Sequence, residues 1–170
     1  MQKPDSTEFA SYYNNYISLV SGDVLDVLQS QGPELRSSIS ALPEEKGAYA
    51  YAEGKWTIKQ LLSHIIDGER VFSYRALRIS RGDETPIEGF EQDDYIERSN
   101  ANERSFADLL DEFDLLRKAN VLLVGNISDA DSRLMGTASG NPVSVRAIVY
   151  IMAGHVQHHL NILNQRYLVQ

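Results

Sequence analysis

Apolar residues recur at helical spacing along most of this chain, and this periodicity limits the possible folds more than any other feature. It is clearest over residues 103–127, where the apolar positions follow one side of a helix. Further helices are predicted over about 6–42, 58–81 and 144–170. No segment shows strand alternation of comparable strength. The sequence therefore predicts an all-α fold, an antiparallel four-helix bundle, in a single domain spanning residues 1–170.

Local signals predict where these helices begin and end. Thr57 and Gln60, in "TIKQ", have the spacing of a capping box at the start of the second helix, and Gly82 is expected to end that helix. Within residues 6–42, the helix is expected to break at Gly22 and at the Gly-Pro pair of residues 32–33. The connections 83–102 and 128–143 are long, which is typical of binding loops or lids.

Composition argues against several classes of partner. The net charge is −8 and the lysines and arginines are scattered, whereas nucleic-acid binding needs concentrated positive charge. No apolar run approaches membrane-spanning length, and the N-terminus has no apolar signal core. The chain has no cysteine, which excludes disulfides and thiolate metal sites. We expect a cytoplasmic protein that binds a small molecule and neither nucleic acid nor membrane.

Three of the four histidines fall within "GHVQHHLNIL". On a helical wheel, His155 and His159 lie about 20° to either side of the centre of the apolar stripe, and His158 lies about 80° away. Two neutral imidazoles at i and i+4 converge well on one divalent cation. The alternative is that His155 and His159 are core residues, each hydrogen-bonded to a neighbouring side chain. The segment lacks the glutamate that serves as general base in the zinc-protease motif, so a protease of that class is excluded. It also lacks the Glu-x-x-His pairs of di-iron carboxylate bundles, so that class of site fits poorly.

The remaining histidine, His64, lies on the second predicted helix, about 90° from the centre of its apolar stripe. This position alone is equally compatible with a metal ligand and with a surface residue.

Three charged residues also need an explanation. Glu69 and Arg117 each lie in an apolar stripe, and charges are rarely buried unless they are paired. We predict that they form an interhelical ion pair; the alternative makes Glu69 a proton acceptor near a metal. Asp67 lies opposite the stripe and is predicted to be solvated, or else to orient His64.

Three stretches of the chain resemble the DinB-like superfamily: "GKWTIKQLLSHIIDGER", "LLRKAN" and "GHVQHHLNIL". These are metal-binding four-helix-bundle proteins related to bacterial thiol-dependent S-transferases. The resemblance covers nearly the whole chain and is weakest before about Lys55. It implies that His64, His155 and His159 hold a divalent metal ion, nickel or zinc, and that the protein forms a homodimer.

The resemblance also implies a function: a metal-dependent small-molecule transferase that uses a low-molecular-weight thiol, or a hydrolase. Because the chain has no cysteine, a sulfur nucleophile would have to arrive with the co-substrate. A different class stays open, that of a non-catalytic, metal-stabilised binding or stress-response module. The sequence assigns no catalytic residue.

Overall fold

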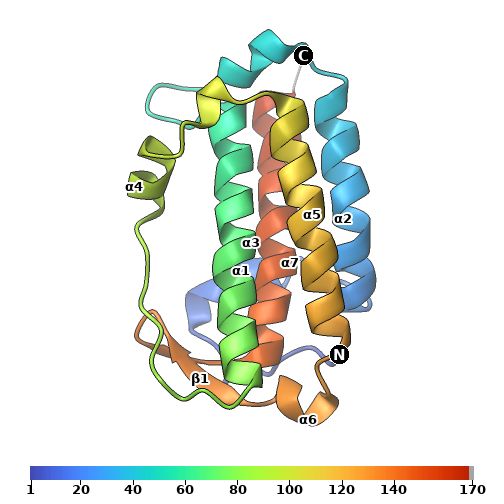
Figure 1. Cartoon of the computed structure of the whole chain (residues 1–170), viewed down its shortest axis with the longest axis vertical. Helices are drawn as coiled ribbons and strands as arrows, with labels where there is room; N and C mark the ends of the chain where they lie inside the picture. The colour runs from blue at the N-terminus through green and yellow to red at the C-terminus, as the bar shows by residue number, and fades with distance from the viewer. Residues whose placement is uncertain (169–170) are drawn as a thin grey trace.

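The computed structural model describes residues 1–168. Four long helices form the body of the molecule: α2 (Val24–Ser40), α3 (Ile58–Ser80), α5 (Phe106–Gly125) and α7 (Val145–Ile162) (Figure 1). The shorter elements are η1 (Ser11–Tyr13), α1 (Asn14–Ile17), η2 (Glu44–Ala48), α4 (Gln92–Glu97), η3 (Ala101–Glu103), α6 (Asp129–Ser132), β1 (Met135–Ala138), β2 (Asn141–Ser144) and the π-helical turn η4 (Leu163–Tyr167). The predicted all-α four-helix bundle is confirmed.

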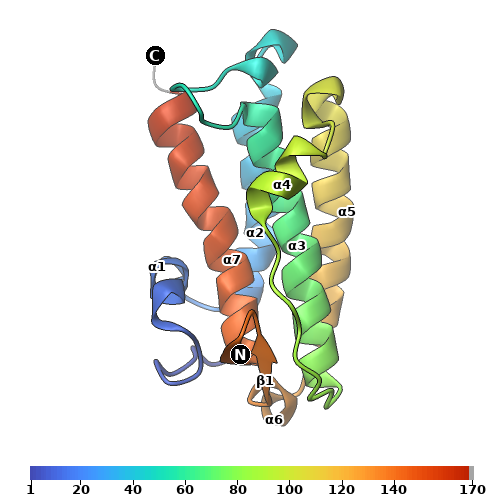
Figure 2. The same ribbon diagram turned by 90° about the vertical axis from the view of Figure 1, so that its left-hand side faces the viewer.

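The order of the helices around the bundle differs from that of a simple antiparallel bundle. α3 packs against α5 and α7, and α2 packs against the same two helices, so α2 and α3 lie on a diagonal. α2 and α7 run in one direction, whereas α3 and α5 run in the other. The expected antiparallel arrangement is therefore wrong for two pairs of neighbours, α3 with α5 and α2 with α7, which are parallel. Because two parallel helices cannot be joined by a tight turn, the chain returns along the whole bundle between α3 and α5, and α4 lies on this crossover (Figure 2).

The predicted helix signals act as expected in α3 and α7. Thr57 and Gln60 form both hydrogen bonds of the capping box at the start of α3, and Gly82 follows the end of this helix at φ 76°. α7 begins directly after Ser144, whose hydroxyl accepts a hydrogen bond from the backbone N–H of Ala147.

Two expectations about secondary structure are corrected. α2 continues through Pro33, because Leu28, Leu35 and Ile39 are buried on one face of this helix and their packing outweighs the one hydrogen bond that proline removes. The connection before α7 also contains a short antiparallel hairpin in which Met135 pairs with Ser144. Its four-residue strands are too short to show a clear alternation in the sequence.

The core consists of two apolar clusters with a polar layer between them. The cluster that contains Val24, Ile79 and Ile148 lies at one end of the bundle, and the cluster that contains Leu35, Leu62 and Leu160 lies at the other. Buried polar residues lie between the members of the two clusters along each helix: Gln31, Glu69, Arg117, Asn120 and His155. His64 and His159 are buried beside them, at the level of the cluster that contains Leu62 and Leu160. Within residues 1–168, none of the helices is both long and apolar enough to cross a membrane.

Candidate metal centre

Three buried histidines meet between α3 and α7. His64 comes from α3, and His155 and His159 come from consecutive turns of α7; they are 4 %, 4 % and 7 % exposed. The Nε2 atom of His155 lies 2.9 Å from Nε2 of His64 and 3.2 Å from Nε2 of His159. One ring nitrogen from each of the three residues lies within 4.8 Å of the others. The structure thus brings together the three histidines that the sequence singled out.

The spacing of these nitrogens fits one bound cation. A tetrahedral ion with metal–nitrogen distances of 2.0–2.1 Å places two ligand nitrogens about 3.3 Å apart. The two Nε2–Nε2 distances given above are close to this value. Imidazole nitrogens suit zinc and nickel, among other divalent ions. The cluster can therefore hold a divalent metal ion.

Burial keeps these imidazoles neutral, as metal binding requires. Burial lowers the pKa of His64 to about 4. It also holds the pKa of His155 and His159 well below the usual value, and the neighbouring imidazoles add to the effect. Neutral nitrogens present lone pairs to a cation without first having to lose a proton.

The rings are held by close packing. Trp56 lies against His64 with ring centroids 4.6 Å apart, and the edges of Tyr16 and Phe72 meet His155 at 5.6 and 5.4 Å. Nδ1 of His159 is buried and has no hydrogen-bond partner within residues 1–168, so that ring is oriented by packing and by the contact of its Nε2 atom with His155.

Two glycines make this packing possible. A Cβ on Gly68 would lie 2.7 Å from Cε1 of His155, and a Cβ on Gly154 would lie 2.2 Å from the carbonyl oxygen of Tyr16. Any side chain at Gly68 would therefore push the His155 ring away from α3. Neither glycine, nor Tyr16, was predicted as part of the site, because close approach between helices leaves no mark on a single sequence.

His158 stays outside the cluster. It is half-buried, and its ring lies against Tyr16 at 5.3 Å and against His159 at 5.0 Å. His64 is buried although its wheel position is marginal, because α5, α7 and α4 all pack against α3 and leave that helix little free surface.

A cavity of about 320 Å³ opens beside the cluster. His159 forms part of its wall, together with Trp56, Tyr167 and the crossover residues Gln92 and Asp93. Figure 2 faces this side of the bundle, where α4 crosses in front of α3. The long connection 83–102 thus reaches the site, as its length suggested. Gln92 and Asp93 themselves were not predicted, because nothing in their local sequence separates them from other polar loop residues.

The predicted pair of Glu69 and Arg117 is confirmed. Arg117 donates to both carboxylate oxygens of Glu69, at 2.6 and 3.1 Å, and also donates to Gln31 at 2.8 Å. Asn120 donates to Glu69 at 2.9 Å. With both of its oxygens bonded, Glu69 is occupied in structural contacts and is not available as a proton acceptor.

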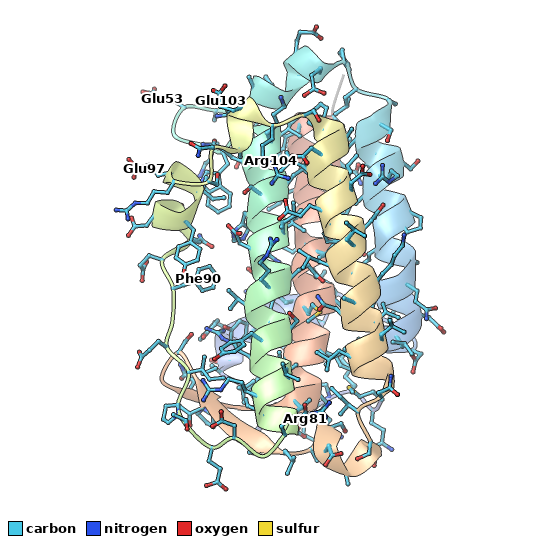
Figure 3. The ribbon with its side chains drawn as sticks, in the orientation of Figure 1. Glu53, Arg81, Phe90, Glu97, Glu103 and Arg104 are labelled. Atoms are coloured by element: carbon cyan, nitrogen blue, oxygen red, sulfur yellow. The ribbon has the colours of Figure 1, made fainter. Side chains whose placement is uncertain are left out.

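Asp67 is less exposed than predicted but keeps part of its surface in solvent, and it makes no hydrogen bond to His64 within the described residues. It is half-buried beside a separate cavity of about 520 Å³ between α3, α4 and α5, which Arg98 and Arg104 also line. Burial raises the pKa of its carboxyl group. The reason is the crossover: α4 covers a face of α3 that the wheel assigned to solvent. Figure 3 shows Arg104 close to this face and Glu97 on the outer side of α4.

The fold and the site together define a four-helix-bundle protein whose histidine cluster can hold a divalent metal ion. The chain belongs to the DinB superfamily, whose family model matches residues 28–163. The family assignment made from the sequence is thereby confirmed.

Proteins similar to this chain include one from Oceanobacillus iheyensis and one from Bacillus subtilis. An Oceanobacillus iheyensis protein named "Putative metal-dependent hydrolase OB0413" is 25% identical over 142 residues, which cover 80% of this chain and 79% of that protein. The solved structure of YfiT from Bacillus subtilis, described as "a probable metal-dependent hydrolase with an unusual four-helix bundle topology", has a TM-score of 0.77. It is 15% identical and covers 96% of this chain and 90% of that one, so this likeness shows the fold alone.

Proposed function

We propose that this protein is a metal-dependent enzyme that acts on small molecules, in the first place by hydrolysis. His64, His155 and His159 hold the metal ion, zinc or nickel. The observation that carries the proposal is the convergence of three neutral, buried Nε2 atoms at metal-ligand spacing. The name of the Oceanobacillus relative, which covers most of the chain, supports the same class of reaction.

A divalent ion held by His64, His155 and His159 would supply Lewis-acid chemistry, since it would lower the pKa of water toward neutral pH and polarise a carbonyl group. The residues of the chain supply the surroundings for this chemistry. Trp56, Tyr16 and Phe72 hold the imidazoles in place and exclude water from one side. Asp93, in the wall of the same cavity as His159, has a carboxylate that can accept a proton from an incoming nucleophile.

The cavity also limits the substrate. Its volume of about 320 Å³ lies at the lower end of the range for small-molecule sites, so it has room for a metabolite-sized molecule or group. A thiol S-transferase is the second reading of the same site. In that reading a low-molecular-weight thiol enters as co-substrate, because the chain has no cysteine of its own.

One experiment separates these alternatives. The purified protein is analysed for metal content, loaded with zinc or nickel, and screened against ester and amide substrates with and without a low-molecular-weight thiol. Hydrolysis that stops when a chelator removes the metal supports the proposal. Turnover only in the presence of thiol selects the transferase. A fully loaded protein that turns over neither set is a binding module, and a protein that takes up no metal refutes the site itself.

A further inference from the structure

The chain buries three arginines in the described residues: Arg75, Arg117 and Arg146, which are 4 %, 3 % and 4 % exposed. Two of them are neutralised by a carboxylate, Arg117 by Glu69 and Arg146 by Glu8. Arg75 forms no ion pair within residues 1–168. A buried charge without a counter-charge is costly, so its retention needs a reason.

The hydrogen bonds of Arg75 orient its guanidinium group without neutralising it. Nη2 donates to the carbonyl oxygen of Glu88 at 3.2 Å and to Oγ of Ser139 at 2.8 Å, and both acceptors are uncharged. Nε is buried and has no hydrogen-bond partner within residues 1–168. One N–H donor of the charged guanidinium group is thus left without an acceptor in the described chain.

Ser139 is held rigidly beside this donor. It lies at the tip of the hairpin with φ 50°, a conformation that non-glycine residues seldom adopt. A parallel bridge to the crossover fixes it there, since its backbone N–H donates to the carbonyl oxygen of Ile87 at 2.9 Å. Because Oγ accepts from Arg75, its own hydroxyl proton is free to be donated to a ligand. Ser139 and Gly140 are the two loop residues between β1 and β2, and a two-residue hairpin turn of this kind uses positive φ at both positions.

The crevice next to Arg75 is small and largely apolar. It has a volume of about 10 Å³ and lies among Ala10, Tyr13, Phe72 and the start of β2, which is enough for one oxygen-sized group. Apolar walls strengthen the attraction between the guanidinium and an anion, because little water screens it. Phe72 separates this crevice from His155.

We propose that Arg75 and Ser139 form an anion site, and that its ligand is a small carboxylate that places one oxygen between Nε of Arg75 and the hydroxyl group of Ser139. Arginine is the side chain best suited to hold a carboxylate, and its hydrogen bonds to an anion are roughly twice as strong as those to a neutral acceptor. The site is formed by α3 and the hairpin and does not depend on a metal at the histidines.

The test uses the full-length protein freed of metal, with sodium acetate as the probe and sodium chloride at equal ionic strength as the reference. The Nε–H resonance of Arg75 is followed by NMR while thermal unfolding is measured in parallel. We expect a saturable shift of this resonance with acetate and a rise in Tm of a few degrees. The NMR measurement needs no variant, so the proposal is testable even if substitutions at Arg75 prevent folding.

Variants locate the effect. Arg75→Met removes the charge and should abolish the rise in Tm, and Ser139→Gly, which suits the positive φ, should weaken acetate binding several-fold. Arg81→Met is the matched control: this exposed arginine lies at the end of the same helix, and its loss should leave the response unchanged (Figure 3). An unmoved Arg75 resonance, an equal rise in Arg75→Met, or an equal shift with chloride would each overturn the carboxylate site. None of these outcomes bears on metal binding at the histidines.

Discussion

Gly68 keeps α3 close enough to α7 for His64 and His155 to meet. A methyl group in its place would lie 2.7 Å from Cε1 of His155. We predict that Gly68→Ala displaces the imidazole, weakens metal binding roughly 10–100-fold, as the loss of a ligand's supporting contacts does, and costs about 1–3 kcal/mol of stability. Calorimetric titration with zinc measures the first effect. Gly125→Ala is the control, because its new methyl group would meet only Leu25 Cδ2 at 3.9 Å. Equal affinities in the two variants would contradict the role given to Gly68.

The histidines themselves provide a sharper test. We predict that His64→Ala, His155→Ala and His159→Ala each abolish stoichiometric metal binding, because two imidazoles rarely suffice for a tight site. His158→Ala should retain the metal, since that ring lies outside the cluster although it is adjacent in sequence. Elemental analysis of the four purified variants decides the matter. Full retention of metal without His64 would show that the site is built differently.

Among the individual residues of the site, the histidines could be predicted from the sequence and the residues around them could not. His155 and His159 were predictable, because a centred i,i+4 pair in an apolar stripe follows from helix geometry alone. His64 needed the family resemblance, since the burial of its face depends on which helices pack around α3. Tyr16 and Asp93 contribute through long-range contacts that no local pattern encodes.

At the level of the elements, the buried pair of Glu69 and Arg117 belongs to a hydrogen-bond network that ties all four long helices together. Arg117 on α5 reaches Glu69 on α3 and Gln31 on α2, and Gln31 in turn donates to the carbonyl oxygen of Ala153 on α7 at 2.8 Å. We predict that Glu69→Leu or Arg117→Met alone costs about 3–5 kcal/mol, because the partner's charge is left buried and unpaired. The double variant should cost clearly less than the sum, as measured by denaturant unfolding.

A surface pair between α2 and α5 serves as the control for this cycle. Arg36 on α2 lies 2.7 Å from Asp111 on α5, and both side chains are exposed. Their coupling energy should stay below about 1 kcal/mol. If the buried pair coupled no more strongly than this surface pair, the network would not be holding the helices together.

A second prediction at this level concerns the N-terminal segment. Glu8 accepts hydrogen bonds from Arg146 and from the hydroxyl of Ser144, and the Ser144 backbone N–H donates to the Glu8 carbonyl oxygen. The hydrogen bond from Arg146, helped by that from Ser144, lowers the pKa of the Glu8 carboxyl group from 4.5 to about 2. Since the unfolded chain then takes up the proton first, the contribution of Glu8 is fully present above about pH 4.5 and is lost as pH falls toward 2. Urea unfolding of wild type and Glu8→Gln should therefore differ at pH 6 and converge near pH 2. A constant difference across this range would show that the charge of Glu8 is unimportant.

Helix boundaries could be predicted from the sequence where neighbouring residues determine them. The capping box of Thr57 and Gln60 and the start of α7 at Ser144 are set by neighbouring residues, and both were predicted. Pro33 is a local signal that tertiary packing overrides. The hairpin could not be foreseen, because part of what fixes it is a bridge from Ile87, some 50 residues earlier in the chain, to Ala138.

For the whole molecule, the order of the helices explains how the site comes about. Because α3 and α5 are parallel neighbours, the chain between them must return along the bundle, and this return brings Gln92 and Asp93 to the cavity beside His159. The same crossover covers Asp67 and carries Ile87 and Glu88 to the hairpin and to Arg75. The crossover therefore forms part of the wall of two cavities, the one beside His159 and the one beside Asp67. Its course could not be deduced from the sequence, because four amphipathic helices can be ordered in several ways around one core.

The expected homodimer stays a prediction.

The last prediction separates a catalytic metal from a structural one. Each of the two apolar clusters is built from all four long helices, so the bundle has a core that does not depend on the histidines. We predict that chelation leaves the helical circular dichroism unchanged and abolishes any turnover. The Tm should fall by about 8–16 °C, the loss expected when a ligand present at a thousand times its Kd is removed. His155→Ala should have a low Tm that no longer responds to the chelator, and His158→Ala should behave as wild type. If chelation unfolds the chain, the ion is needed for folding, and the proposal of an open catalytic position fails in favour of a structural site.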